Sequence, residues 1–159
     1  MSSPLPKGLT GRIALIVALA ALTIGLGATP AFAVTTVNAT PDTELSDVEA
    51  TKVTVTGSGY AASTQYRAGL CSAETYGLMG IPACSAFKTI SSDASGNIST
   101  SLELEKENVN VHAGIPFPLN VGQPAEFTCQ GEEGDVCEVV IATHGGSPSI
   151  LAGEVVTFQ

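Results

Sequence analysis

The fold class is decided by residues 93–105, which read DASGNISTSLELE. The first four residues are typical of a turn, in which Gly96 tolerates a positive φ. From Ile98 onward, the residues at 98, 100, 102 and 104 share one side of an extended chain, while those at 99, 101, 103 and 105 are polar and share the other. This period of two predicts a β-strand with one face against a core and one face in solvent.

Short segments of the same kind lie on both sides of this strand. They are separated by turn residues and cover residues 53–56, 66–71, 87–92, 126–129, 137–143 and 154–158. No segment after Ala33 keeps a helical period of 3.6 for ten residues. We therefore predict an all-β fold, an antiparallel sandwich of seven or eight strands.

Composition limits the classes of function. The chain has 159 residues, enough for one domain, and 44% of them are apolar, which is too many for a disordered chain. Fifteen acidic residues stand against six basic ones, and the net charge is −9. Because phosphate groups would be repelled, we expect no direct nucleic-acid binding by the protein.

The N-terminal segment is typical of a secretory signal peptide. Lys7 and Arg12 precede the fourteen uncharged residues 13–26, and Ala31-Phe32-Ala33 supplies a small-x-small cleavage site. An uncleaved membrane anchor is the alternative, but a helix of this length rises only about 21 Å, short of a hydrocarbon core of about 30 Å. We expect residues 1–33 to be a signal peptide and residues 34–159 to be a secreted domain of net charge −11, with no stable membrane span.

Four cysteines follow the signal segment, at positions 71, 84, 129 and 137. In an exported chain this number favours two disulfides, for which three pairings are possible. The neighbouring pairs 71–84 and 129–137 are favoured, because they close short loops and need no long-range docking first. An immunoglobulin-type bridge from Cys71 to Cys129 would ordinarily pack against a tryptophan, and the chain has none.

Several short motifs follow one another in a characteristic order and spacing. They are Leu45-Ser46-Asp47, a Val-Thr strand ending in Gly57-x-Gly59-Tyr60, Tyr66 five residues before Cys71, then Cys84, Phe87, the turn at 93–96 and the second cysteine pair. Together they resemble the neocarzinostatin (macromomycin or actinoxanthin) family of secreted apoproteins, over nearly all of residues 34–159. The resemblance implies a seven-stranded immunoglobulin-like sandwich with a two-stranded ribbon, and the local disulfides Cys71–Cys84 and Cys129–Cys137.

The resemblance also implies a function. Family members hold an enediyne chromophore noncovalently in a cleft, protect it and deliver it as an antibiotic, and the released chromophore rather than the protein attacks DNA. The chain would then be a noncatalytic carrier of a small apolar aromatic ligand, with no covalent cofactor, and we expect a monomer. An immunoglobulin-like structural or interaction module of the cell envelope, without a small ligand, is the alternative.

Eight residues are candidates for lining such a cleft. A flat ligand needs an apolar slot with a few polar atoms to fix its orientation. Phe87 stands six residues before the turn aspartate, as the cleft phenylalanine of the family does, although ordinary core packing is the alternative for this residue. The other candidates offer apolar surface or match the family's cleft positions: Tyr76, Leu78, Ile81, Phe117, Glu138, Ala142 and Thr143, with Met79 and Leu119 nearby.

The resemblance is uneven at these positions. The family pattern has a neutral amide where this chain has Glu138, and a serine where it has Ala142 or Thr143. A buried ionised carboxylate is costly unless it is paired, so Glu138 should either face solvent or select a cationic group on the ligand. The connection from Lys106 to Pro124 is several residues longer than usual and could either wall the cleft or fill it.

No catalytic or metal-binding motif stands out. The chain lacks a G-x-S-x-G nucleophile elbow and the C-x-x-C spacing of a zinc site. His112 and His144 lie 32 residues apart, and the acidic loop with Glu132, Glu133 and Asp135 lacks the ligand spacing of a calcium loop. We therefore expect neither an enzyme nor a metal site.

Overall fold

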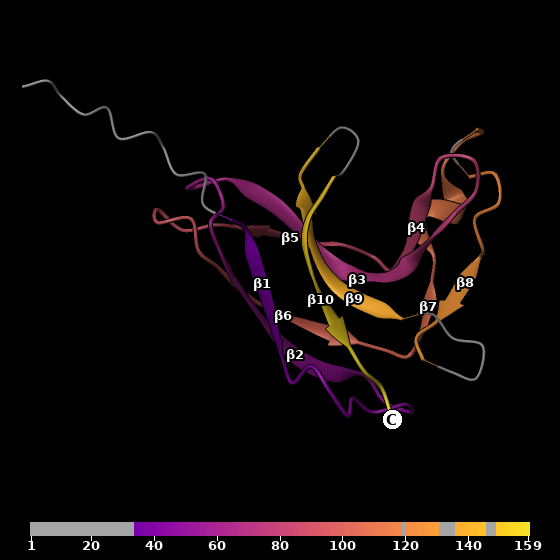
Figure 1. The fold of residues 1–159 in the computed structure, drawn as a ribbon, viewed down its shortest axis with the longest axis horizontal. Helices are drawn as coiled ribbons and strands as arrows, with labels where there is room; N and C mark the ends of the chain where they lie inside the picture. The colour runs from indigo at the N-terminus through magenta and orange to yellow at the C-terminus, as the bar shows by residue number, and fades with distance from the viewer. Residues whose placement is uncertain (1–33, 119, 131–135, 146–148) are drawn as a thin grey trace, which may run out of the picture. The chain divides into compact units, whose positions relative to one another are not determined.

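A computed structural model describes residues 34–118, 120–130, 136–145 and 149–159 (Figure 1). They lie within one unit of the chain, Phe32–Gln159. The expected signal segment, Leu119 and the acidic loop at 132–135 fall outside the described residues. Within the described part of the chain, no helix is long and apolar enough to cross a membrane.

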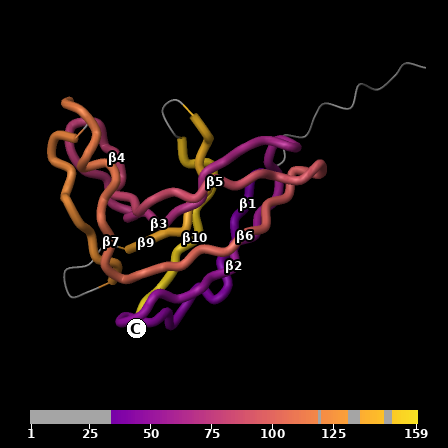
Figure 2. Tube along the Cα trace, turned by 180° about the vertical axis from the view of Figure 1, so that it is seen from behind, coloured from indigo at the N-terminus to yellow at the C-terminus, as the bar shows by residue number. Residues whose placement is uncertain are grey.

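Two antiparallel sheets and a ribbon make up the fold (Figures 1 and 2). The first sheet has the order β1-β2-β6, and the second has the order β10-β9-β3-β4, with β5 also paired to β3. The strands of the first sheet are β1 (Thr36–Thr40), β2 (Thr51–Ser58) and β6 (Ile98–Leu104). Those of the second are β3 (Gln65–Tyr76), β4 (Ile81–Cys84), β5 (Lys88–Ser91), β9 (Cys137–Thr143) and β10 (Ile150–Val156).

The ribbon consists of β7 (Glu107–Val109) and β8 (Glu126–Thr128), and a short 3-10 turn, η1 (Val111–Gly114), follows β7. Among the described residues the two sheets contain eight strands, of which β4 pairs only with the end of β3. The predicted all-β antiparallel sandwich with a two-stranded ribbon is confirmed. The hairpin of β3 and β4, which we call the arm, projects from the sandwich in both views.

The apolar residues that alternate along β6 are part of the core, as predicted. Leu102 of β6 lies opposite Val53 of β2, and both side chains are buried. From the second sheet, Leu70 of β3 and Ile141 of β9 are buried in the same cluster. Burial of such side chains contributes about 1.5–3 kcal/mol each, so this inter-sheet contact is the main stabilising interaction.

Three strands were not predicted, and β2, β3 and β10 extend beyond their predicted bounds. In β1 only Val37 and Ala39 are buried, so its alternation is too weak to stand out. The other two, β4 and β7, have four and three residues, and β4 contains Pro82, which is usually excluded from central strands. The last strand, β10, begins at Ile150 rather than at 154.

The glycine-tyrosine motif after β2 joins separate parts of the sandwich. A Cβ atom at Gly57 would lie 2.9 Å from the ring of Tyr60, so the ring occupies space that only glycine leaves open. The hydroxyl of Tyr60 donates to the carbonyl of Thr36 at 2.9 Å, and its ring meets Tyr66 edge-on at 5.1 Å. Tyr60 therefore ties β1 and β2 to the start of β3.

Burial of Tyr60 predicts a loss of stability at alkaline pH. Burial, with a smaller effect of Tyr66, raises the pKa of Tyr60 from 10.0 to about 12. Above pH 10 the unfolded chain loses this proton while the folded protein keeps it, so the free energy of unfolding should fall as the pH rises from 10 to about 12. Urea unfolding across this range should show a weaker fall for Tyr60→Phe than for the wild type. Equal falls in the two proteins would contradict the assignment.

Candidate ligand site on the outer face of the second sheet

The outer face of β3, β9 and β10 is the face turned away from the core. Along β9, Val139 and Ile141 are in the main core cluster, so strand alternation places Glu138, Val140 and Ala142 on the outer face. The pairing of the three strands aligns these residues into three rungs. The rungs are Cys71, Glu138 and Val155; Gly69, Val140 and Gly153; and Arg67, Ala142 and Ile150.

The middle rung carries a glycine on each side of Val140. A Cβ atom at Gly69 would lie 2.9 Å from Cδ1 of Phe87, and one at Gly153 would lie 2.6 Å from Oε2 of Glu138. The Phe87 ring therefore lies against β3, and the Glu138 carboxylate lies against β10. Glycine inside a strand commonly marks such a close approach.

A disulfide forms the edge of this face at the base of the arm. Cys71 and Cys84 are opposite each other on β3 and β4, with their Cα atoms 4.0 Å apart. With Val140 they form a small buried cluster, separate from the main core, against which the half-buried Phe87 packs. The second bridge joins Cys129 to Cys137, so both favoured local pairings are confirmed.

A buried asparagine fastens the long connection after β7 to the arm. Asn110 is 3% exposed, and its Oδ1 accepts from the backbone N–H of Cys84 at 3.1 Å and of His112 at 3.0 Å. Its Nδ2 donates to the Gln123 side chain at 3.0 Å and to the Pro124 carbonyl at 2.8 Å. All of its main hydrogen-bonding positions are occupied, as burial requires.

The same connection places a second ring beside Phe87. Nδ1 of His112 donates to the carbonyl of Pro82 at 2.7 Å, and the His112 ring centroid lies 6.3 Å from that of Phe87. Nε2 of Gln123 donates to the carbonyl of Ile81 at 3.0 Å. The described part of the connection therefore lies along β4 and borders the outer face on that side.

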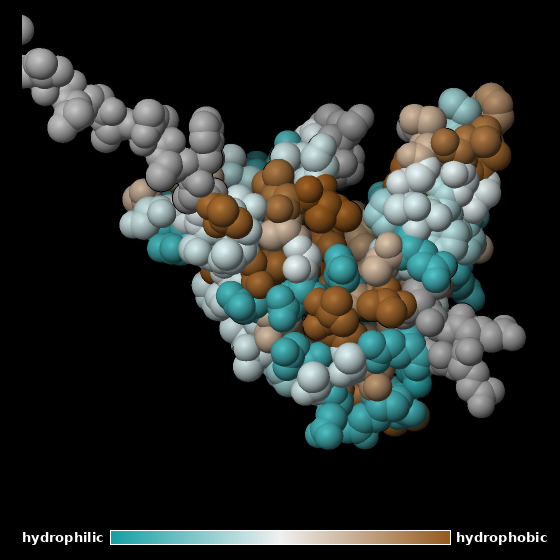
Figure 3. All heavy atoms as spheres, in the orientation of Figure 1, coloured by the Kyte–Doolittle hydropathy of each residue, from teal (hydrophilic) through white to brown (hydrophobic). Residues whose placement is uncertain are grey.

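The space-filling view shows a hollow between the arm and the ends of β9 and β10 (Figure 3). Apolar surface lines the β9–β10 side of this hollow. Val140 and Ala142 are each only 1% exposed. On the same face Phe87 and Glu138 are half-buried, so they are more exposed than the strand residues Val140 and Ala142.

The predicted cleft residues fall into two groups. Phe87, Glu138 and Ala142 come together on the outer face, with Ile81 half-buried on β4 nearby in the chain. The others lie in different surroundings. Tyr76 packs against the main core cluster, and its hydroxyl is 3.5 Å from that of Ser72. Leu78 and Met79 are exposed in the turn of the arm, and Phe117 is 81% exposed. Thr143 is opposite Tyr66, and its hydroxyl accepts a hydrogen bond from the N–H of Ser149.

Sequence reasoning missed four residues that shape this site. Gly69 and Gly153 provide the space for Phe87 and Glu138, and the signal for each was a glycine inside a strand. Asn110 carried no sequence signal, because a single asparagine in a loop is common. His112 was considered only as a metal ligand with His144, and among the described residues no group of three His, Cys, Asp or Glu side chains could hold a metal ion.

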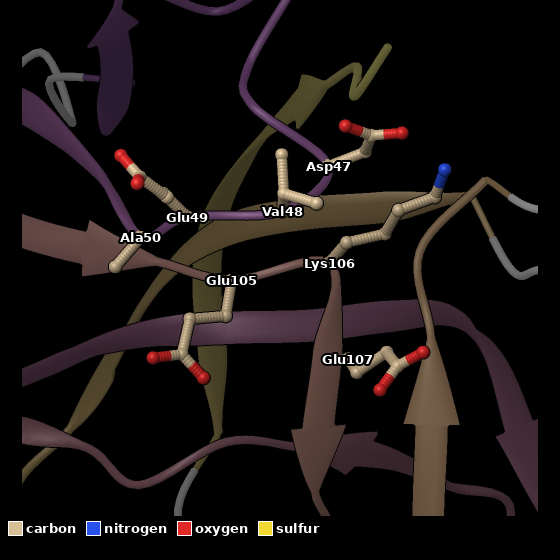
Figure 4. A pocket seen from close by; sticks show the side chains of 7 residues that line it. All are labelled: Asp47, Val48, Glu49, Ala50, Glu105, Lys106 and Glu107. Carbon is tan, nitrogen blue, oxygen red and sulfur yellow. The ribbon is translucent and has the colours of Figure 1, made fainter.

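Two surface pockets lie away from the outer face. One, of about 350 Å³, lies on the ribbon, and the other, of about 250 Å³, is acidic. Figure 4 shows that the carboxylates of the acidic pocket point in different directions, with Glu105 and Glu107 directed away from Asp47. Neither pocket includes a residue of the three rungs.

These features define a disulfide-linked immunoglobulin-like sandwich with an apolar outer face beside a projecting arm. The neocarzinostatin family model matches residues 37–121, more than half of the chain, and the chain belongs to this family. Macromomycin has a similar structure, with a TM-score of 0.56 and 23% identity over 79% of this chain and 99% of its own. Apokedarcidin in solution gives a TM-score of 0.50 and 24% identity over 80% of this chain and all of its own. The comparison with curated proteins found no similar sequence.

The Asn110 contacts predict a stability cost that an exposed asparagine does not carry. Asn110→Ala leaves the buried N–H of Cys84 without its acceptor, and we expect a loss of about 1–3 kcal/mol in the free energy of unfolding. Asn38→Ala, on the exposed face of β1, should change it by less than about 0.5 kcal/mol. Urea denaturation of both variants is the measurement, and equal losses would show that the Asn110 contacts do not fasten the connection.

Proposed function

We propose that the protein is a noncatalytic carrier that binds a small apolar aromatic molecule, such as an enediyne-like chromophore, noncovalently on the outer face of β3, β9 and β10. The observation that carries this proposal is that the Phe87 ring packs against Gly69, beside the Cys71–Cys84 disulfide. An aromatic ring held against a strand offers a flat apolar contact surface for another ring. Phe87 is only half-buried, so part of this surface remains exposed to solvent.

The surroundings of Phe87 support this assignment over ordinary core packing. Phe87 is half-buried and packs against the small outer cluster, whereas Phe127 of the ribbon is 5% exposed and belongs to the main core. Two polar side chains could orient a ligand: Glu138, whose carboxylate lies against Gly153, and His112, whose ring lies 6.3 Å from that of Phe87. A chromophore of the class implied by the family would be held by these side chains, which supply binding and exclusion of water rather than chemistry.

A pair of phenylalanine variants tests the proposal. Phe87→Ala should weaken binding of the neutral fluorescent probe naphthylmethanol at least about tenfold while lowering the free energy of unfolding by only about 1–2 kcal/mol. Phe127→Ala should lower the free energy of unfolding by about 3–5 kcal/mol and leave probe affinity unchanged in the folded protein. Probe titration and urea unfolding are run on the same samples. A Phe87→Ala protein with full affinity would rule out this face as the site.

We also propose that the carrier is exported and that cleavage after Ala33 releases the domain 34–159. The basic front, the uncharged stretch and the small-x-small site support this step. N-terminal sequencing of the protein from the culture medium of an expressing strain should begin at Val34. Recovery of the full chain, starting at Met1, from the membrane fraction would instead support a retained anchor.

An interaction module of the cell envelope is the second candidate, and the tip of the arm favours it. Leu78 is 82% exposed and Met79 is 58% exposed, and Phe117 of the neighbouring connection is 81% exposed. Exposed apolar side chains of this size are found at contact surfaces with other proteins. The two candidates differ in the probe titration, because a module without a small ligand would not bind naphthylmethanol in a manner that depends on Phe87.

A further inference from the structure

The carboxylate of Glu138 is set into an apolar part of the outer face. Its neighbours in the same rung are Val155 and Cys71, and Cys71 is 1% exposed. The next residue of β9 on the same face is the buried Val140. Oε2 lies against Gly153, where a Cβ atom would come within 2.6 Å of it. The carboxylate therefore lies along the sheet surface rather than extending from it into solvent.

No group of the described chain compensates this charge. Within the residues that the structure describes, the Glu138 carboxylate takes part in no hydrogen bond or ion pair. Arg67 is on the same face but pairs with Ala142, four residues from Glu138, which corresponds to about 13 Å along the strand. The lysines of the domain lie on other elements: Lys52, Lys88 and Lys106.

The undescribed parts of the domain add no cation. Residues 119, 131–135 and 146–148 contain no lysine, arginine or histidine. His112 uses Nδ1 to donate to Pro82 and faces Phe87. His144 follows β9, six residues from Glu138, and Val34, the expected N-terminus after cleavage, lies beside Gly59. A ligand is therefore the source of a cation that we consider for Glu138.

An ionised carboxylate on an apolar surface loses hydration without gaining a partner, which costs free energy. A cation on a ligand would offset this cost by pairing with the carboxylate. The attraction is stronger there than in bulk water, because apolar side chains lower the local dielectric. A protonated amine fits this demand, since it is compact and donates hydrogen bonds to both carboxylate oxygens.

We propose that Glu138 makes the site selective for ligands that carry a protonated amine next to their aromatic part. This inference rests on the proposed carrier function. The Phe87 ring lies against Gly69 and the Glu138 carboxylate lies against Gly153. These two glycines are two strands apart in the same rung, so the ring and the carboxylate are separated by about 10 Å. In naphthylmethylamine the nitrogen lies about 6 Å from the centre of the far ring, and its hydrogen bond to a carboxylate oxygen adds about 3 Å, so the two together nearly span this distance.

The test compares three probes that share one ring system: naphthylmethylamine, naphthylmethanol and naphthylacetate. The chain has no tryptophan, so probe fluorescence can be followed with little protein background. The wild-type domain should bind the amine about fivefold to tenfold more tightly than the alcohol, and the alcohol more tightly than the acetate. Glu138→Gln should bring the amine and the alcohol to equal affinity.

Glu154→Gln is the matched control, because it removes the same charge from the neighbouring strand. Glu154 is opposite Val139, whose side chain points into the core, so it belongs to the other face of the sheet. This variant should keep the preference for the amine. Loss of the preference in both variants would assign it to overall charge and overturn the inference.

The remaining outcomes separate this inference from the carrier function. If the wild type binds the alcohol in a Phe87-dependent manner but binds the amine no more tightly, the carrier function stands and the selectivity is refuted. If none of the three probes binds, the carrier function fails and the inference falls with it. Thermal unfolding of each variant confirms that the titrated protein is folded.

Discussion

The structure depends on one strand that serves two parts of the molecule. The first part of β3 lies between β9 and β5 in the sandwich, and its last residues pair with β4 in the arm. The pairing with β4 shifts register between Cys71 and Thr75, and the Cys71–Cys84 disulfide is placed where this change begins. Along the sandwich part, Tyr66, Ala68 and Leu70 point into the core, so Gly69 and Cys71 point outward. The arrangement of the core, the arm and the outer face follows from the path of β3.

The outer face combines little bulk with two functional side chains. In the middle rung, only Val140 has a side chain that rises from the strands, because its partners are Gly69 and Gly153. The space left by the glycines is taken by Phe87 on one side and Glu138 on the other. A ring and a charge are thereby held at the level of the sheet, each by packing rather than by a hydrogen-bond network of its own. Such a surface suits a flat molecule better than a peptide, which would need a free strand edge to pair with.

The fold was largely predictable because its signals are local. The period of two in 98–104 and the close cysteine pairs depend only on neighbouring residues, and both predictions are confirmed. The site was less predictable, because it depends on register between strands far apart in the chain. Gly69 meets Val140 only because β3 pairs with β9, and no pattern in either segment specifies that alignment. For the same reason Phe87 and Glu138 were identified from family positions, whereas the glycines beneath them and the buried Asn110 were not.

The contacts along β4 also affect how this molecule meets other copies of itself. A strand at the border of a sheet presents unpaired N–H and C=O groups that can template a strand from another chain, and proteins use several devices to prevent this. Here side chains occupy those groups: Asn110 accepts from Cys84, His112 donates to Pro82, and Gln123 donates to Ile81. Pro82 itself has no N–H to offer. The long connection thus protects the projecting arm from edge-to-edge aggregation, a hazard for any protein that must remain dispersed at high concentration.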